Sequence, residues 1–283
     1  MSKRVADIVA ETLAAHGIRH AFGIPGGEVI TLVDALGLAG IRFILSRHET
    51  AAATMAAGAS TVSNTPGLLV TTLGPGLANA INGIADAAQE HVPLIVISGV
   101  VDHDIRGRYT HQVVDQAKLL SPLVKASFEV EATGAGATVA RALAVATTHP
   151  MGPVHIDFAP GTAAQPTNAA DKVVKPTEHV VASIAANDTA IVDVRRALQN
   201  AERPIAIAGL YAVHDEAGSQ LTELIDRFQC PIITTYKAKG IVDENDALCL
   251  GGAGLSPLAD ATLLPLIKSA DLVLLAGYNP VSY

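Results

Sequence analysis

The fold of this chain is decided by the stretch Ser46-Arg47-His48-Glu49-Thr50-Ala51-Ala52-Ala53-Thr54-Met55-Ala56-Ala57-Gly58. The apolar residues 41–45 before it are typical of a strand, and the alanine-rich residues after Glu49 favour a helix. Glu49 is therefore expected just beyond the carboxyl end of a strand, in the first turn of the following helix. Because open α/β sheets bind their ligands at that edge, Glu49 is the first candidate site residue.

A second strand-to-helix turn repeats this arrangement. Residues 67–72 form an apolar run, Gly74-Pro75-Gly76 interrupts it, and a helix is expected over residues 77–89. If the two strands are neighbours, a carboxylate and an open backbone loop face one crevice. Each turn also has a simpler explanation. The helix dipole alone stabilises an acid in a first turn, and a glycine–proline turn can be a plain connection.

The alternation of strands and helices continues along the chain. Further strands are expected at 20–23, 94–98 and 154–158, separated by helical segments. This pattern predicts a parallel sheet with helices on both faces. Residues 161–188 are rich in Pro, Thr, Asn, Lys and Ala without a hydrophobic period, and we interpret them as an interdomain linker.

The same pattern returns after this linker, with strands expected at 204–209, 231–235 and 272–277. The sequence therefore predicts the α/β class, with two doubly wound parallel-sheet domains at 1–160 and 189–283. Because the sequence stops shortly after the last predicted strand, the second domain is expected to be incomplete.

Composition narrows the class of protein. Of 283 residues, 49% are hydrophobic and 16% charged, which predicts a large core and favours oligomerisation. The net charge of −8 without a basic block argues against nucleic acid and anionic membranes as partners. No apolar run is long enough to span a membrane or resembles a signal peptide, so we expect a soluble cytoplasmic protein. Cys230 and Cys249 lack metal-ligand spacing and are expected to be buried thiols, and no metal site is expected in this chain.

Several motifs in order give the chain a family resemblance. It resembles the N-terminal half of thiamine-diphosphate-dependent enzymes of the acetohydroxyacid (acetolactate) synthase type. The matching motifs are Phe22-Gly23-Ile24-Pro25-Gly26-Gly27, Arg47-His48-Glu49, Gly74-Pro75-Gly76-Leu77-Ala78-Asn79, Gln112-Val113-Val114-Asp115, Gly152-Pro153-Val154-His155-Ile156-Asp157 and Gly277-Tyr278-Asn279-Pro280-Val281. The resemblance covers essentially the whole chain. It implies a pyrimidine-binding domain of the thiamine-diphosphate-binding fold, followed by a Rossmann-like central domain.

The resemblance also implies roles for particular residues. Glu49 would hydrogen-bond the pyrimidine ring nitrogen of thiamine diphosphate, so that the cofactor's exocyclic amine can act as a base. Gln112 would face the reacting carbons. The implied residues on the cofactor side are Pro25, Gly26, Gly27, Thr72, Gly74, Pro75, Gly76 and Asn79.

Three substitutions, at two places in the sequence, depart from the family pattern near the expected substrate. Glu28 stands where the synthases usually carry a small residue; it is either a second catalytic carboxylate or an acid stabilised by a helix dipole. His111 replaces a common phenylalanine and Val113 a glutamate, so the substrate pocket is expected to differ from that of an ordinary acetolactate synthase. His111 would protonate a carbonyl or bind a carboxylate, with a structural histidine as the alternative.

A third departure is an absence. The family holds the diphosphate and a divalent ion with a motif that begins Gly-Asp-Gly, whereas this sequence contains no Gly-Asp dipeptide and no P-loop. The chain is therefore expected to be either one subunit of a split enzyme or a fragment of a longer polypeptide. The starting methionine favours the split enzyme. Its partner subunit, expected in an α2β2 assembly, would carry the diphosphate and Mg²⁺ domain.

The expected function is that of the pyrimidine-binding subunit of a carboligase or lyase acting on a 2-keto acid, ketone or acyloin. The alternatives are a non-catalytic structural or regulatory subunit, or the N-terminal piece of a full-length enzyme. Flavin (FAD) is a further candidate cofactor, through the turns at Gly209-Leu210-Tyr211 and Gly251-Gly252-Ala253-Gly254, although structural turns are the commoner explanation for such glycines.

Overall fold

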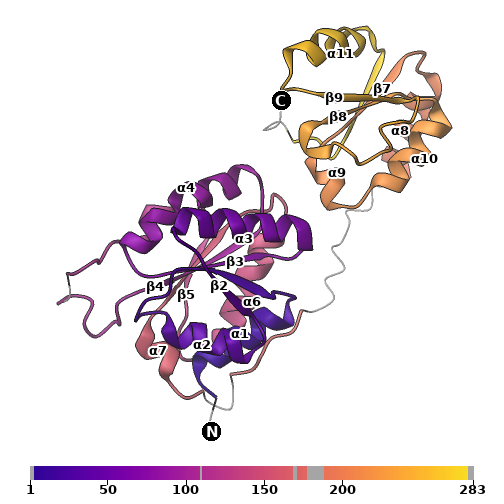
Figure 1. The fold of residues 1–283 in the computed structure, drawn as a ribbon. Helices are drawn as coiled ribbons and strands as arrows, with labels where there is room; N and C mark the ends of the chain where they lie inside the picture. Colours follow the sequence, from indigo (N-terminus) through magenta and orange to yellow (C-terminus); the bar gives the residue numbers. More distant parts are fainter. Residues whose placement is uncertain (1–2, 109, 168–170, 177–187, 280–283) are drawn as a thin grey trace. The chain divides into compact units, whose positions relative to one another are not determined.

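The structure, a computed structural model, describes residues 3–108, 110–167, 171–176 and 188–279 (Figure 1). The chain divides into two compact units, Met1–His179 and Val180–Tyr283. Each unit contains one parallel sheet with helices packed on it. The prediction of two α/β parallel-sheet domains is confirmed.

The sheet of the first unit has six parallel strands in the order β2-β1-β3-β4-β6-β5. The chain leaves β1 toward β2 on one side, and β3 lies on the other side, so the order reverses between β1 and β3. Ligand crevices of such sheets lie at this reversal, beyond the carboxyl ends of the strands. The elements are α1 (Val5–Ala15), β1 (His20–Gly23), α2 (Ile30–Leu38), β2 (Arg42–Leu45), α3 (Glu49–Ser63), β3 (Gly67–Thr71), α4 (Pro75–Gln89), β4 (Leu94–Gly99), α5 (Gln116–Leu120), β5 (Ser127–Glu129), α6 (Ala135–Thr147), β6 (Val154–Phe158) and α7 (Pro160–Ala164).

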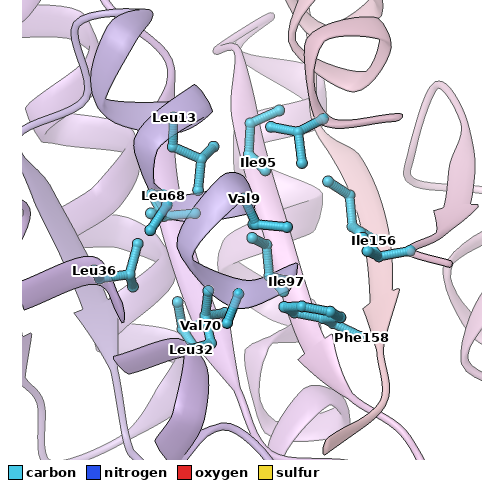
Figure 2. Close-up of a cluster of buried hydrophobic side chains, with 14 of the residues drawn as sticks. Val9, Leu13, Leu32, Leu36, Leu68, Val70, Ile95, Ile97, Ile156 and Phe158 are labelled. Atoms are coloured by element: carbon cyan, nitrogen blue, oxygen red, sulfur yellow. The ribbon is translucent and has the colours of Figure 1, made fainter. Parts of the chain in front are cut away.

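Two apolar layers enclose this sheet, one on each face. Every residue of β3 and β4 is buried, as expected for central strands whose side chains alternate between two covered faces. One layer joins Val70 and Ile97 to residues of α1, α2 and α6, and Figure 2 shows part of it. The other joins Leu69 and Val96 to α3 and α4. The sheet is thereby fixed with its carboxyl edge beside the first turns of α3 and α4.

The helices α3 and α4 pack closely because small residues line their contact. A Cβ added to Gly83 of α4 would lie 2.6 Å from the Cβ of Ala53 in α3. The Thr50 hydroxyl donates a hydrogen bond of 2.5 Å to the backbone oxygen of Asn79. The helix expected from residue 77 begins instead at Pro75, because proline suits the first position of a helix, where its missing N–H costs nothing.

Several residues of the predicted linker lie against the first unit. Residues 160–164 form α7, and the Val5 N–H donates to Gln165 O at 2.9 Å. Farther along, the Val174 N–H donates to the Thr12 hydroxyl at 3.4 Å. Residues 168–170 and 177–187 of the linker lie outside the described residues.

The second unit has a sheet of four parallel strands in the order β10-β7-β8-β9. The short strand β9 and the short helices were not expected, because a glycine-rich strand and single helical turns carry little periodicity. Its elements are α8 (Asp188–Asn200), β7 (Pro204–Ala208), α9 (Leu210–His214), α10 (Gly218–Phe228), β8 (Ile232–Thr235), η1 (Tyr236–Ala238), β9 (Cys249–Ala253), α11 (Pro257–Ser269) and β10 (Leu272–Ala276).

The two cysteines of this unit are both free thiols, Cys230 buried and Cys249 half-buried. Pro280 and Val281 of the last sequence motif lie outside the described residues. Within the part of the chain that the structure describes, no helix combines the length and apolar character needed to cross a membrane.

Candidate active site

Glu49 is the first residue of α3 and only 8% exposed, as the sequence predicted for an acid in the first turn. His48 caps the helix, its Nδ1 accepting from the Thr50 N–H at 3.2 Å. The Asn79 side-chain amide donates to Glu49 Oε2 at 3.1 Å. The carboxylate therefore benefits from the helix dipole and is oriented by a residue of α4.

The turn before α4 brings a hydroxyl close to this carboxylate. A Cβ added to Gly76 would lie 2.2 Å from Thr72 Oγ1 and 3.6 Å from Glu49 Oε1, so both groups lie beside the glycine. Gly74 has φ of +53°, and its added Cβ would lie 2.0 Å from Gln112 O. Only glycine fits this conformation and this close approach. Pro75 is exposed at the surface of the turn.

The turn between β1 and α2 adds a second carboxylate. A Cβ added to Gly26 would lie 2.4 Å from Thr72 Cγ2 and 3.1 Å from Glu28 Oε2. Glu28 is half-buried and lies directly before Val29, the N-cap of α2, a position that suits either a catalytic carboxylate or a helix-start acid. Thr72 thus lies between Gly26, in the turn that carries Glu28, and Gly76, which lies beside Glu49. In the same turn Pro25 and Gly27 are exposed.

Gln112 and His111 lie in an exposed loop after β4. Gln112 has φ of +59°, an uncommon conformation for a residue with a side chain. It lines a pocket of about 420 Å³ beside the Gly74 turn, whereas His111 does not. The pocket is lined by Leu73, Val100, Val101, Arg106, Gln112, Val113, Val114, Asp115, Gln116, Ala117, Glu129 and Asp157. Its volume suits a small ligand.

Two residues at the floor of this pocket were not singled out from the sequence. Gln116 is 3% exposed, and its Oε1 accepts from the Gly74 N–H at 2.9 Å. Its Nε2 donates to Gly99 O at 3.1 Å and to Asp157 Oδ1 at 2.5 Å. Asp157, an acid in the otherwise apolar end of a buried strand, was the one available signal.

The environment of Asp157 changes its proton affinity. Burial raises the pKa of Asp157 to about 6, partly opposed by the hydrogen bond from Gln116. His155 Nε2 lies 3.4 Å from Asp157 Oδ1 and 3.2 Å from Ser98 Oγ. Burial lowers the pKa of His155 to about 4, so this histidine is neutral at pH 7 and gives Asp157 no counter-charge.

Two family models match the chain. The model described as the thiamine pyrophosphate enzyme N-terminal TPP binding domain matches residues 3–119, and the thiamine pyrophosphate enzyme central domain matches residues 191–282. Both matches agree with the resemblance found in the sequence motifs.

Curated relatives match along the whole chain. Acetolactate synthase of Bacillus subtilis (strain 168) is 30% identical over 100% of this chain and 49% of its own length. The acetolactate synthase large subunit of Haemophilus influenzae is 32% identical over 96% of this chain and 48% of its own length. The chain thus spans about half the length of the curated relatives it matches.

A solved structure supports the fold. A protein of Mycobacterium smegmatis, described as a proposed thiamin diphosphate-dependent enzyme, superposes with a TM-score of 0.84 at 21% identity. The match covers 99% of this chain and 54% of that one. At this identity the likeness carries the fold alone.

Proposed function

Because this chain belongs to the thiamine pyrophosphate enzyme family and carries its N-terminal and central domains, we propose that its first unit binds the aminopyrimidine of thiamine diphosphate. The observation that carries the proposal is the buried Glu49 carboxylate, which lies at the start of α3 beside the glycine turn at Gly76. A carboxylate there can hold a proton at a ring nitrogen of the ligand.

The residues around Glu49 fit this ligand. A Cβ at Gly76 would lie 2.2 Å from Thr72 Oγ1, so the glycine lets this hydroxyl come close to the Glu49 carboxylate. Asn79 fixes the other carboxylate oxygen. Thr72, Gly26 and Gly74 form the remaining wall of the site, and the exposed Pro25, Gly27 and Pro75 are assigned to its rim.

When bound, the cofactor supplies a nucleophilic carbon and an electron sink for forming or cleaving a carbon–carbon bond. The chain's own residues supply orientation and proton transfer. Glu49 would hold the proton at the pyrimidine nitrogen, and Glu28 would act as a second acid–base group across Thr72. Gln112 would face the substrate from the wall of the pocket.

The curated relatives support an acetolactate-synthase-like reaction. We propose carbon–carbon bond formation or cleavage, by a transferase or lyase, on a 2-keto acid, ketone or acyloin, substrates that the pocket of about 420 Å³ can admit. His111 lies in the exposed loop beside this pocket. It is proposed to meet the substrate's carbonyl or carboxylate at the pocket entrance.

We propose that a domain outside these 283 residues holds the diphosphate and Mg²⁺, either on a partner subunit in an α2β2 assembly or farther along a longer polypeptide. This rests on the lack of a Gly-Asp dipeptide in the sequence. Among the described residues no group of three or more His, Cys, Asp or Glu side chains is placed to hold a metal ion. The rival is a non-catalytic subunit, which would not need a buried acid at Glu49.

A flavin does not fit the turn at Gly209. The Tyr211 N–H donates to Gly277 O at 3.0 Å, and a Cβ added to Gly209 would lie 2.6 Å from the same oxygen. The turns after β7 and β10 therefore pack directly on one another and leave no room for a nucleotide between them. We assign no step to FAD.

The test is Glu49→Gln in the enzyme assembled with its diphosphate domain. Consumption of a 2-keto acid is expected to fall about 100-fold or more, because a neutral amide cannot hold the proton. The control is Glu131→Gln, an exposed acid in the same unit that lies outside the site. Wild-type rates in the Glu49 variant would overturn the proposal.

A further inference from the structure

We propose that Gln116 is a positioning residue that fixes the glycine turn at Gly74, and that Asp157 in turn fixes Gln116. The contacts themselves do not depend on the reaction. Only the step from the turn to cofactor binding rests on the proposed function.

The Gln116 amide joins the ends of three strands. Gly74 follows β3, Gly99 ends β4 and Asp157 lies in β6. The Gln116 amide forms a hydrogen bond with each of them, at 2.9, 3.1 and 2.5 Å respectively. Each partner allows only one role for the amide: the Gly74 N–H needs an acceptor, and the Gly99 carbonyl needs a donor. The orientation of the amide is therefore determined by its partners, and a flipped amide would lose these bonds.

The contact matters because Gly74 is the N-cap of α4. Gly74 has φ of +53° and ψ of −105°, and the hydrogen bond from its buried N–H to Gln116 Oε1 fixes this backbone conformation. Without this acceptor the N–H would be buried and unpaired, a state that proteins avoid. Since α4 also carries Asn79, the partner of Glu49, a shifted turn would displace the start of the helix that orients the candidate catalytic acid.

Asp157 stands in a polar row that crosses the carboxyl edge of the sheet. Thr71 of β3, Ser98 of β4, Asp157 of β6 and Glu129 of β5 are in register on neighbouring strands. Side chains at matching positions of parallel strands lie on one face, here the face that Gln116 covers from α5. The Thr71 hydroxyl donates to Ser98 Oγ at 3.2 Å.

Among the residues that the structure describes, no cation is paired with Asp157 alone. Arg106 donates to Glu129 Oε1 at 2.7 Å and to Val101 O at 3.2 Å, and His103 Nε2 lies 2.9 Å from the same Glu129 oxygen. The titratable and charged groups that face Asp157 are Asp115 beside α5, Glu129 from β5, Arg106 from the loop after β4 and His155 on its own strand. The Gln116 N–H is thus the short hydrogen bond that stabilises the ionised Asp157.

The link is expected to weaken on acidification. Protonation of Asp157 replaces a charge-assisted bond by a neutral one. With its pKa near 6, the change falls within a pH range in which the protein can be studied. The Gly74 amide should report it, since this amide shares the Gln116 side chain with Asp157.

The test is amide hydrogen exchange and the ¹⁵N–¹H shift of Gly74 in the full chain, without cofactor, between pH 5 and 8. In the wild type the Gly74 shift should titrate with a midpoint near 6. Asp157→Asn should abolish that titration while the amide stays protected. Gln116→Leu should lower Gly74 protection at least about tenfold, corrected for intrinsic rates, while Ile84 in the middle of α4 keeps its protection.

Two further variants keep the test decisive. Gln116→Glu keeps an acceptor for the Gly74 N–H but loses the two hydrogen bonds that the Gln116 Nε2 donates. It is used in place of Gln116→Leu if the leucine variant does not fold. Gln116→Glu should also change the chemical shift of the Gly74 amide and the pH titration of that shift. Gln89→Ala, at the exposed C-terminal end of α4, is the control and should change nothing. A Gly74 amide that responds to none of the Gln116 and Asp157 variants would overturn the proposal.

Cofactor binding separates this inference from the proposed function. In the enzyme assembled with its diphosphate domain, Gln116→Leu should weaken the binding of thiamine diphosphate with Mg²⁺ about tenfold. If the exchange results hold but thiamine diphosphate binds neither variant nor wild type, the positioning role stands and the proposed function fails. Unchanged exchange overturns the positioning role whatever the cofactor does.

Discussion

Replacing Asp157 by asparagine should make the free energy of unfolding of the first unit rise with pH more steeply than it does in the wild type. The effect is confined to the range between about pH 4 and 6.5. It arises because Asp157 and His155 are neighbours on one buried strand whose pKa values are displaced in opposite directions.

The magnitude follows from the two pKa values. Burial raises the pKa of Asp157 from 3.8 to about 6, so the folded state favours the protonated carboxyl. The stabilisation that this gives the folded state is complete below pH 3.8 and is lost as the pH rises to about 6. Burial lowers the pKa of His155 from 6.5 to about 4, so its contribution is full above pH 6.5 and is lost as the pH falls to about 4. Each change corresponds to about 3 kcal/mol. In the wild type the two contributions nearly cancel.

The assay is native-state hydrogen exchange of Val96, a buried residue of β4, measured against urea at several pH values. This amide reports opening of the first unit alone. Asp157→Asn leaves the His155 contribution unopposed, so the opening free energy should rise by about 3 kcal/mol relative to wild type from pH 4 to 6.5. His155→Gln should show the opposite trend, a fall of similar size.

The comparison of each variant with the wild type removes the contribution of all other titrating groups. If Asp157→Asn shows the same pH dependence as the wild type, Asp157 is not desolvated in the folded state. The reasoning from its burial would then be refuted.

Two further variants test the packing of α3 against α4 and the orientation of Glu49. Gly83→Ala should lower the free energy of unfolding by about 1–3 kcal/mol in urea titrations, because its Cβ would lie 2.6 Å from an alanine Cβ of α3. The control is Gly58→Ala, in the open middle of α3, which should instead raise the free energy of unfolding by up to about 1 kcal/mol. Equal effects of the two substitutions would contradict the close packing of α3 and α4. Asn79→Asp should weaken the binding of thiamine diphosphate to the assembled enzyme about tenfold, since Glu49 would lose a hydrogen-bond donor and face a like charge. Unchanged affinity in a calorimetric titration would show that Asn79 does not orient Glu49.

The parts of the fold that the sequence predicted are those with strong local patterns. The strands β3 and β4 are buried on both faces and therefore appear as continuous apolar runs. Glu49 was placed correctly in the first turn of α3 because strand, acid and alanine-rich helix follow one another directly. Of the motifs that indicated the family, all but the one at residues 152–157 lie within the residues that the two family models match, 3–119 and 191–282.

The parts that the sequence missed depend on distant contacts. Gln116 owes its importance to Gly74, Gly99 and Asp157, residues that come together only in the folded sheet. The three-residue strand β5 is too short for its period to be recognised. The composition of residues 161–188 suggested a linker, since single hydrogen bonds, such as those from the Val5 N–H to Gln165 O and from the Val174 N–H to the Thr12 hydroxyl, leave no hydrophobic pattern.

The roles of the site residues remain predictions, although the structure brings most of them together. Glu49, Thr72 and Glu28 lie around the glycine turns at the reversal of the strand order. The crevice rule for α/β sheets had predicted a site at this edge. In contrast, His111 lies in an exposed loop and does not line the pocket, so its proposed role rests on its departure from the family pattern alone.

The most direct test of the central claim is isothermal titration of thiamine diphosphate with Mg²⁺ into this chain alone and into its mixture with a partner that carries the Gly-Asp-Gly motif. The account predicts binding in the mixture only, weakened by Glu49→Gln and unaffected by Glu131→Gln. Tight binding to the isolated chain would contradict the assignment of the diphosphate site to a partner. Equal affinity of the Glu49→Gln and wild-type mixtures would contradict the assignment of Glu49 to the pyrimidine.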